Sequence, residues 1–151
     1  MTRLTLPRDR YLDLSTPQVM GILNVTPDSF SDGGQHNTLD NAVNRALTML
    51  DQGATIIDVG GESTRPGADD VAEQEELQRV VPVINAIRER SDCVISIDTS
   101  KAGVMTAAVQ AGADIINDVR ALQEPGALSA AASAQVPVCI MHMRGQPRSM
   151  Q

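Results

Sequence analysis

Residues 94–118, VISIDTSKAGVMTAAVQAGADIIND, contain the pattern that decides the fold. A short β-branched run, Val94–Ile97, leads into Asp98, and a second apolar run leads into Asn117 and Asp118. Between the two runs, apolar residues recur at steps of three and four and the pattern stops at Gly112. The runs are typical of strands buried on both faces, and the stretch between them is typical of an amphipathic helix. The segment is therefore a strand–helix–strand unit with a polar residue at the end of each strand.

The same unit repeats along the chain. Strand-like runs are predicted at Val19–Leu23, Thr55–Val59, Val94–Ile97, Asp114–Ile116 and Val136–Met141, and helices at 39–50, 77–87, 104–111 and 127–134. Asn37 or Thr38 is expected to cap the first helix and Gly53 to end it. Pro82 is expected to kink the second helix. Before the first unit, Leu4–Leu6 and 11–14 are compatible with a small hairpin.

Every predicted strand delivers a polar residue at its carboxyl end. These residues are Asn24, Asp58, Asp98, Asn117 with Asp118, and His142. In a (β/α)₈ barrel all strand ends meet at one mouth, whereas a doubly wound sheet gathers its ligand groups near one switch point. The sequence therefore predicts an α/β fold, namely the first five strands and four helices of a (β/α)₈ TIM barrel. Eight units need about 250 residues, so residues 1–151 are expected to form the amino-terminal part of a single barrel domain. The alternative is a complete five-stranded doubly wound domain.

Composition excludes several classes of partner. The formal net charge is −7 and only Tyr11 and Phe30 are aromatic, so neither a basic surface nor a base-stacking platform for nucleic acid is expected. No apolar run approaches the ~20 residues of a membrane helix, and the amino terminus does not resemble a signal peptide. Cys93 and Cys139 are expected to be buried, reduced thiols, and a bacterial-type cytoplasm fits.

Two polar loops follow the first and second strands. Residues 24–34 begin with Asn24, whose amide oxygen suits a hard cation such as Mg²⁺ when a substrate phosphate supplies further oxygens. Residues 60–67 bring together two glycines, two hydroxyls and Arg65, a set that can hold a phosphate. The alternative is that both stretches are ordinary polar turns.

Asp98 and Asn117 end neighbouring strands. Side by side they can bind a ring with adjacent donors and acceptors, such as the edge of a pterin or purine. Asp98 could instead belong to a helix cap, although Thr99 or Ser100 is the preferred capping residue. Asp58, inside an apolar run, is expected to be a buried, hydrogen-bonded structural carboxylate. His36 and His142 are too few to indicate zinc.

Five segments in this order resemble the bacterial dihydropteroate synthases. They are residues 20–34, 57–67, 96–101, 116–119 and 141–143, and the first two are long and specific. The resemblance implies a (β/α)₈ barrel enzyme of folate biosynthesis. Such an enzyme condenses 6-hydroxymethyl-7,8-dihydropterin diphosphate with 4-aminobenzoate to give 7,8-dihydropteroate and diphosphate, and sulfonamides compete with the aminobenzoate. It also implies a homodimer in the cytoplasm, with small-molecule substrates and no nucleic-acid or membrane partner.

The resemblance also assigns roles to individual residues. Asp98 is implied to be catalytic and Asn24 to hold Mg²⁺, the expected cofactor. The residues implied to bind substrate are Phe30, Ser63, Thr64, Arg65, Pro66, Asp98, Asn117 and Met141. The loop with Phe30 also holds Asp28 and Ser29.

The chain departs from the family pattern in length. The later Asp-Pro-Gly, Ser-Arg-Lys and Arg-x-His motifs of the family are absent, so the 151-residue chain alone is expected not to be a competent enzyme. Two alternatives are an inactive or binding-only barrel fragment and a pterin-dependent methyltransferase. The methyltransferase would not need the two polar loops.

Overall fold

The computed structural model describes residues 2–26, 35–62 and 71–142. Its strands are β1 (Arg3–Leu6), β2 (Arg10–Asp13), β3 (Met20–Asn24), β4 (Ile56–Gly60), β5 (Val94–Asp98), β6 (Ile115–Asp118) and β7 (Val138–Ile140). Its helices are α1 (Gln35–Asp51), α2 (Glu73–Arg90), α3 (Ala102–Ala111) and α4 (Ala127–Ala134). Among the described residues, no helix is both long and apolar enough to cross a lipid bilayer.

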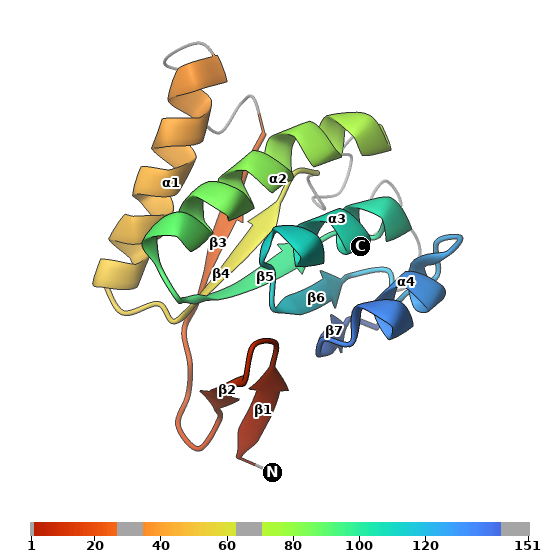
Figure 1. Ribbon diagram of the computed structural model, residues 1–151, viewed down its shortest axis with the longest axis horizontal. Coiled ribbons are helices and arrows are strands. Elements are labelled where there is room, and N and C mark those ends of the chain that lie inside the picture. Colours follow the sequence, from red (N-terminus) through yellow and green to blue (C-terminus); the bar gives the residue numbers. More distant parts are fainter. Residues whose placement is uncertain (1, 27–34, 63–70, 143–151) are drawn as a thin grey trace.

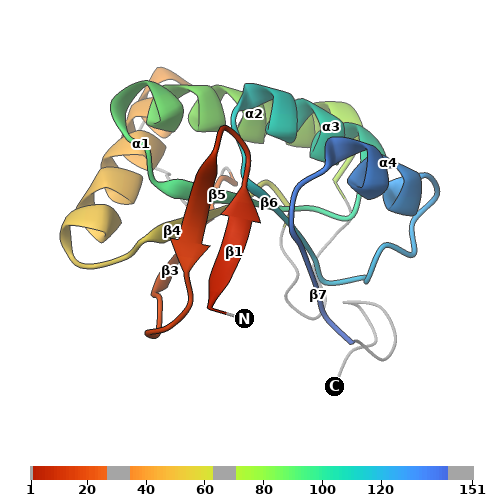
Figure 2. The same cartoon turned by 60° about the horizontal axis from the view of Figure 1, so that its bottom comes forward.

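Strands β3 to β7 form one parallel sheet in simple chain order. The four helices alternate with these strands and lie on one face of the sheet (Figures 1 and 2). A doubly wound sheet reverses its strand order and carries helices on both faces, whereas a barrel keeps chain order with helices only outside. The described part of the chain is therefore the first five strands and four helices of a (β/α)₈ barrel, as predicted.

The two faces of the sheet differ in chemistry. On the helix side, Leu23, Ile57 and Ile97 are fully buried in the main apolar core. On the opposite side, Ile22 of β3 is 63% exposed, and polar residues Asp58 and Ser96 follow in register on β4 and β5. Because strand residues alternate between faces, the residues that pack against the helices separate from those on the opposite side, where Asp58 and Ser96 lie beside apolar residues such as Ile22. This opposite side is the inner surface of the partial barrel.

The predicted hairpin is present and lies against the amino-terminal ends of the sheet strands (Figure 2). Leu6 and Leu12 pack in a second apolar cluster with Ile56, Val94 and Ile115. These last three residues are the first residues of β4, β5 and β6, respectively. The hairpin thus covers the end of the barrel that is opposite to the functional end of this fold.

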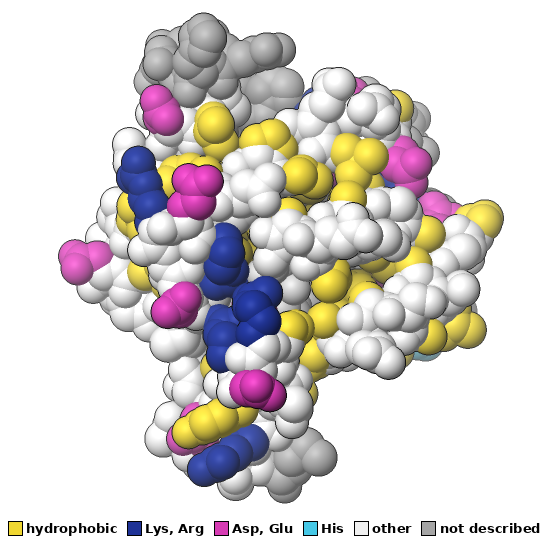
Figure 3. All heavy atoms as spheres, in the orientation of Figure 1, with side chains coloured by type: hydrophobic (Ala, Val, Ile, Leu, Met, Phe, Trp, Pro, Cys, Tyr) yellow, Lys and Arg dark blue, Asp and Glu magenta, His cyan; other side chains and the backbone are white. Residues whose placement is uncertain are grey.

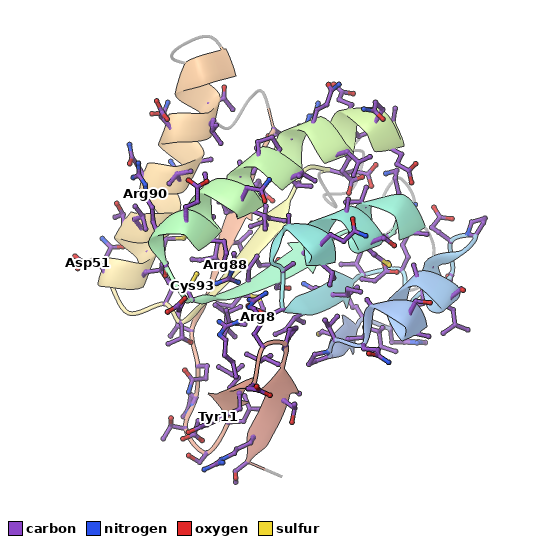
Figure 4. The ribbon with its side chains drawn as sticks, viewed as in Figure 1. Arg8, Tyr11, Asp51, Arg88, Arg90 and Cys93 are labelled. Atoms are coloured by element: carbon purple, nitrogen blue, oxygen red, sulfur yellow. The ribbon has the colours of Figure 1, made fainter. Side chains whose placement is uncertain are left out.

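A buried carboxylate fastens the hairpin to the sheet. Asp114, whose side chain is fully buried, accepts from Arg8 at 3.1 Å, from Arg10 at 2.7 Å and from Arg88 of α2 at 2.8 Å. Figure 3 shows basic side chains gathered between the end of α2 and the hairpin, and Figure 4 places Arg8 and Arg88 there. Arg88 also donates to the carbonyls of Gly112 and Cys93. We call these four charged residues the Asp114 cluster.

Some local predictions are wrong. Helix α1 begins at Gln35, so Asn37 and Thr38 lie inside the helix and do not cap it. Helix α2 continues as one helix through Pro82, which is exposed. Whether α2 bends there stays a prediction. Cys139 is exposed and Cys93 half-buried, because Cys139 lies on β7, which is an edge strand among the described residues.

Gly112, where the apolar pattern stops, is the C-cap of α3 and has a φ of +123°. An added Cβ would lie 3.1 Å from Nε and 3.2 Å from Cγ of Arg88. Gly112→Ala is therefore expected to lower the free energy of unfolding by roughly 1–3 kcal/mol, measured by urea denaturation. Gly53→Ala is the matched control, since Gly53 has a φ of +117° in open space. Equal losses in both variants would show that contact with Arg88 adds nothing.

Candidate active site

The carboxyl ends of the parallel strands place the predicted site residues in one row. Strand register pairs Asn24 with Gly60, Gly60 with Asp98, and Asp98 with Asn117. Neighbouring strands lie about 4.8 Å apart, so Asp98 and Asn117 are adjacent and Asn24 lies two strands from Asp98. Gly60 leaves room beside the carboxylate, since an added Cβ would lie 3.5 Å from Oδ2 of Asp98. The structure thus brings three predicted residues together across the mouth of the barrel.

The remaining predicted residues divide into two groups. Met141 follows β7 and is 49% exposed, at the same end of the sheet as Asn117. His142, next to it, is also exposed. Phe30, Ser63, Thr64, Arg65 and Pro66 lie outside the described residues, as do Asp28 and Ser29.

Asn117 is held by a buried acid. Its Nδ2 donates to Oδ1 of Asp58 at 3.3 Å, and Asp58 is only 4% exposed. Burial raises the pKa of Asp58, and the hydrogen bond from Asn117 opposes that rise. Asp58 is therefore a buried, hydrogen-bonded carboxylate, as predicted, and its bond fixes the amide of a residue at the mouth.

Asp98, the acid of this row, has a strongly raised pKa. Burial raises its pKa to about 7, and the nearby negative charges of Asp58, Glu76, Asp118 and Glu62 add to the rise. No hydrogen bond joins its carboxylate to another side chain among the described residues. A carboxylate with this pKa, in a row of polar strand ends, is typical of a functional site.

The predicted caps beside Asp98 have other partners. Helix α3 begins after Lys101 without a side-chain cap. Thr99 Oγ1 donates to Glu76 at 2.5 Å, and Ser100 Oγ donates to Asp118 at 2.6 Å. Both hydroxyls donate to buried carboxylates, because such carboxylates need donors. The structure contradicts the capping prediction but leaves Asp98 available at the mouth.

Sequence reasoning missed a charged network next to Asp98. Lys101 Nζ donates to Glu76 Oε1 at 2.7 Å and to Glu62 Oε2 at 3.1 Å. Glu76 is fully buried on α2. One signal was available, because Glu76 lies four residues before Val80 and so falls on the apolar stripe of the helix. The predicted stripe placed Leu77 and Val81 there, but both are only half-buried.

The side chains at the mouth determine which kind of metal site can form there. Among the described residues, no group of three or more His, Cys, Asp or Glu side chains could hold a metal ion. Asn24 is exposed and offers one amide oxygen at the mouth. A single neutral oxygen fits Mg²⁺ that is held chiefly by substrate phosphates and water, and does not fit a metal held by a full protein cage.

The structure is a parallel half-barrel with Asp98 and Asn117 at adjacent strand ends. Residues 20–151 match the family model described as "Pterin binding enzyme". The chain belongs to the pterin-binding enzyme family.

Close relatives carry a more specific description. A curated dihydropteroate synthase of Haemophilus influenzae is 64% identical over 95% of this chain. A Yersinia pestis dihydropteroate synthase, solved with a sulfonamide drug complex, matches with a TM-score of 0.90 and 65% identity over 99% of the chain. The Xanthomonas albilineans dihydropteroate synthase solved with 4-aminobenzoic acid matches with a TM-score of 0.90 and 54% identity over 95% of the chain. The chain covers 52%, 54% and 52% of these proteins, respectively, or about half of each.

Proposed function

We propose that this chain is the amino-terminal part of a dihydropteroate synthase and that residues 1–151 belong to a single pterin-binding barrel domain. The complete protein would condense 6-hydroxymethyl-7,8-dihydropterin diphosphate with 4-aminobenzoate. The observation that carries the proposal is the register row Asn24–Gly60–Asp98–Asn117 in a chain 64% identical to a curated dihydropteroate synthase. A polar row on the ends of β3 to β6 provides hydrogen-bonding groups for a ring and an oxygen for a metal–diphosphate.

The reaction needs no protein nucleophile. The bond between the methylene carbon and the diphosphate oxygen breaks, and its electron pair leaves with diphosphate. The aminobenzoate nitrogen forms the new bond to that carbon and then loses one proton to solvent. The dihydropterin ring can stabilise positive charge on the methylene during this exchange. The protein therefore has to bind the ring, orient it and stabilise the charges that develop.

Asp98 and Asn117 are proposed to bind the pterin ring. The ionised Asp98 carboxylate would accept hydrogen bonds from ring N–H groups, while the Asn117 amide offers a donor and an acceptor. Asp58 supports this role because its bond to Asn117 Nδ2 fixes which way that amide faces. The charge of Asp98 would also stabilise the methylene as it becomes cationic.

Asn24 is the residue proposed to hold Mg²⁺ together with the substrate diphosphate. When bound, the metal would offset negative charge on the leaving group. Met141 is proposed to line the pterin pocket. Phe30, Ser63, Thr64, Arg65 and Pro66 are proposed, from the resemblance alone, to contact the diphosphate and aminobenzoate. The homodimer, the cytoplasmic location and sulfonamide binding likewise stay predictions from the sequence.

Aminobenzoate-dependent release of diphosphate tests the function. The assay compares the 151-residue chain with the polypeptide made from the whole open reading frame, with Mg²⁺ and with EDTA. We expect the polypeptide from the whole open reading frame to release diphosphate in Mg²⁺ and the 151-residue chain to release none. EDTA should abolish the release. Release that does not require aminobenzoate would contradict the proposal. Methyl transfer from a methylated pterin, or pterin binding without turnover, would favour the two alternatives from the sequence.

Pterin binding is expected to depend on pH through Asp98. Its pKa of about 7 in the free protein means that the carboxylate is mostly protonated at pH 6 and mostly ionised at pH 8. Only the ionised form accepts two hydrogen bonds from the ring, so the dissociation constant of a pterin should be roughly tenfold higher at pH 6 than at pH 8. Isothermal titration calorimetry measures this change, and Asp98→Asn should remove it. A pH-independent constant in the unsubstituted protein would contradict the role of Asp98.

A further inference from the structure

Charged side chains from three separate parts of the chain meet behind the Asp98 carboxylate. Lys101, just before α3, bonds to Glu62, which follows β4, and to Glu76 of α2. The Lys101, Glu62 and Glu76 side chains are 23%, 13% and 0% exposed, respectively. Burial alone would lower the pKa of Lys101, but its bonds to the two carboxylates raise it overall. The lysine is therefore charged, and the trio carries one net negative charge.

Glu62 and Glu76 also bond to residues outside the trio, and Lys101 does so through its backbone N–H. Glu62 Oε2 accepts from the backbone N–H of Val71 at 2.7 Å, which brings residues 62 and 71 together. Glu76 Oε2 accepts from Thr99, the residue after Asp98, at 2.5 Å. Thr99 in turn accepts from the N–H of Lys101 at 3.2 Å, and its own N–H donates to the carbonyl of Asn117 at 3.1 Å. One connected set of bonds thus links the chain after β4 to the chain after β5.

Close packing keeps this set against α2. An added Cβ on Gly61 would lie 3.0 Å from Val80 and 3.2 Å from Glu76 Cγ, so the backbone before Glu62 lies directly on the helix. The Gly61 carbonyl also accepts from Arg79 at 2.7 Å. Glu62 and Glu76 are therefore held at a fixed separation, which Lys101 bridges.

We propose that Lys101, with Glu62 and Glu76, positions the pterin-binding carboxylate of Asp98. The trio fixes the backbone that follows β4 and the backbone that follows β5, and it sets the electrostatic environment of that carboxylate. The inference rests on the proposed function, which does not assign these three residues a role. The negative charges that add to the raised pKa of Asp98 are those of Asp58 of β4, Glu76, Asp118 of β6 and Glu62. Lys101 is the cation bonded to two of these carboxylates, Glu62 and Glu76, so its loss and the loss of one carboxylate should act on Asp98 in opposite directions.

The test uses two substitutions of opposite charge effect in the polypeptide from the whole open reading frame. Lys101→Met leaves two uncompensated carboxylates, so the acidic limb of the pH profile of kcat/KM should move up by roughly one pH unit. Glu62→Gln keeps the shape of the side chain and removes a negative charge, so the limb should move down by about half a unit. Lys101→Arg should restore the limb. Glu89→Gln, an exposed charge removal at the other end of α2, should leave it unchanged.

If the trio were merely structural, both variants would lose activity, but the acidic limb would not move up in Lys101→Met and down in Glu62→Gln. That result would overturn the proposal. An independent measurement is hydrogen exchange at the Val71 amide, which should quicken at least tenfold in Lys101→Met and stay unchanged in Glu89→Gln. If the unsubstituted protein releases no diphosphate, the proposed function fails, and exchange at Val71 still decides whether Lys101 holds this segment. Unchanged exchange would overturn the proposal.

Discussion

Replacing Asp98 by asparagine is expected to reduce turnover by roughly 10²–10³-fold, because an electrostatic interaction that stabilises a developing charge is lost. The substitution preserves size and removes the negative charge. The measurement is aminobenzoate-dependent diphosphate release at pH 8, with Glu89→Gln as the control for a lost carboxylate. Turnover within a few-fold of the unsubstituted protein would rule out the proposed role of Asp98.

The same substitution is expected to make the protein more stable at high pH. Because the pKa of Asp98 rises from 3.8 to about 7 on folding, the folded state binds more protons than the unfolded state between these values. The free energy of unfolding therefore falls as the pH increases from about 4 to 7. Asp98→Asn removes this loss, so its stability should exceed that of the unsubstituted protein by roughly 1–3 kcal/mol at pH 8 and should equal it near pH 3.5. Urea unfolding at both pH values measures the difference, and a gain at pH 3.5 alone would contradict the sign.

Replacing Asp114 by alanine is expected to lower the free energy of unfolding by about 3–5 kcal/mol. The substitution leaves Arg8, Arg10 and Arg88 facing one another without their shared carboxylate. The loss is costly mainly at Arg88, whose side chain is only 17% exposed. The backbone N–H of Ile95 also loses its acceptor, Asp114 Oδ2, which lies at 3.0 Å. Urea denaturation measures the loss.

Glu124→Ala is the control for the Asp114 substitution. Glu124 pairs with Arg120, four residues earlier in the chain, at 2.7 Å, and its side chain is 40% exposed. A pair of this kind contributes at most about 1 kcal/mol. If Asp114→Ala costs no more than Glu124→Ala, the Asp114 cluster does not stabilise the fold and the hairpin is held by its apolar contacts alone.

Much of the fold could be predicted because each strand carries its own signal. Local pattern alone indicates a strand at Val94–Ile97 and a helix at 127–134. Both elements lie where expected. Boundaries were less certain where no residue marks them. Helix α1 starts before Thr38, because a threonine that can cap a helix can also lie within one when the preceding turn is already helical.

The candidate site was predictable where its residues end strands, and not where they lie on helices. Asp98 and Asn117 follow from the position of polar residues after apolar runs, since parallel strands bring their carboxyl ends together. Glu76 of α2 depends on a partner far along the chain, since Lys101 is 25 residues away. The same holds at the opposite end of the sheet, where Arg8 is 106 residues from Asp114. A buried acid is tolerated only with such partners, and a single sequence does not reveal which residues they are.

The distance along the chain between the hairpin and Asp114 has a consequence for synthesis on the ribosome. The hairpin is made before the rest of the described chain, yet the carboxylate that fastens it is made more than a hundred residues later. Leu6 and Leu12 likewise gain their full apolar contacts only when Ile115 has emerged. The hairpin therefore docks fully only after the chain up to Ile115 has been made, and until then the amino-terminal ends of β4 and β5 are exposed to chaperones and to other nascent chains.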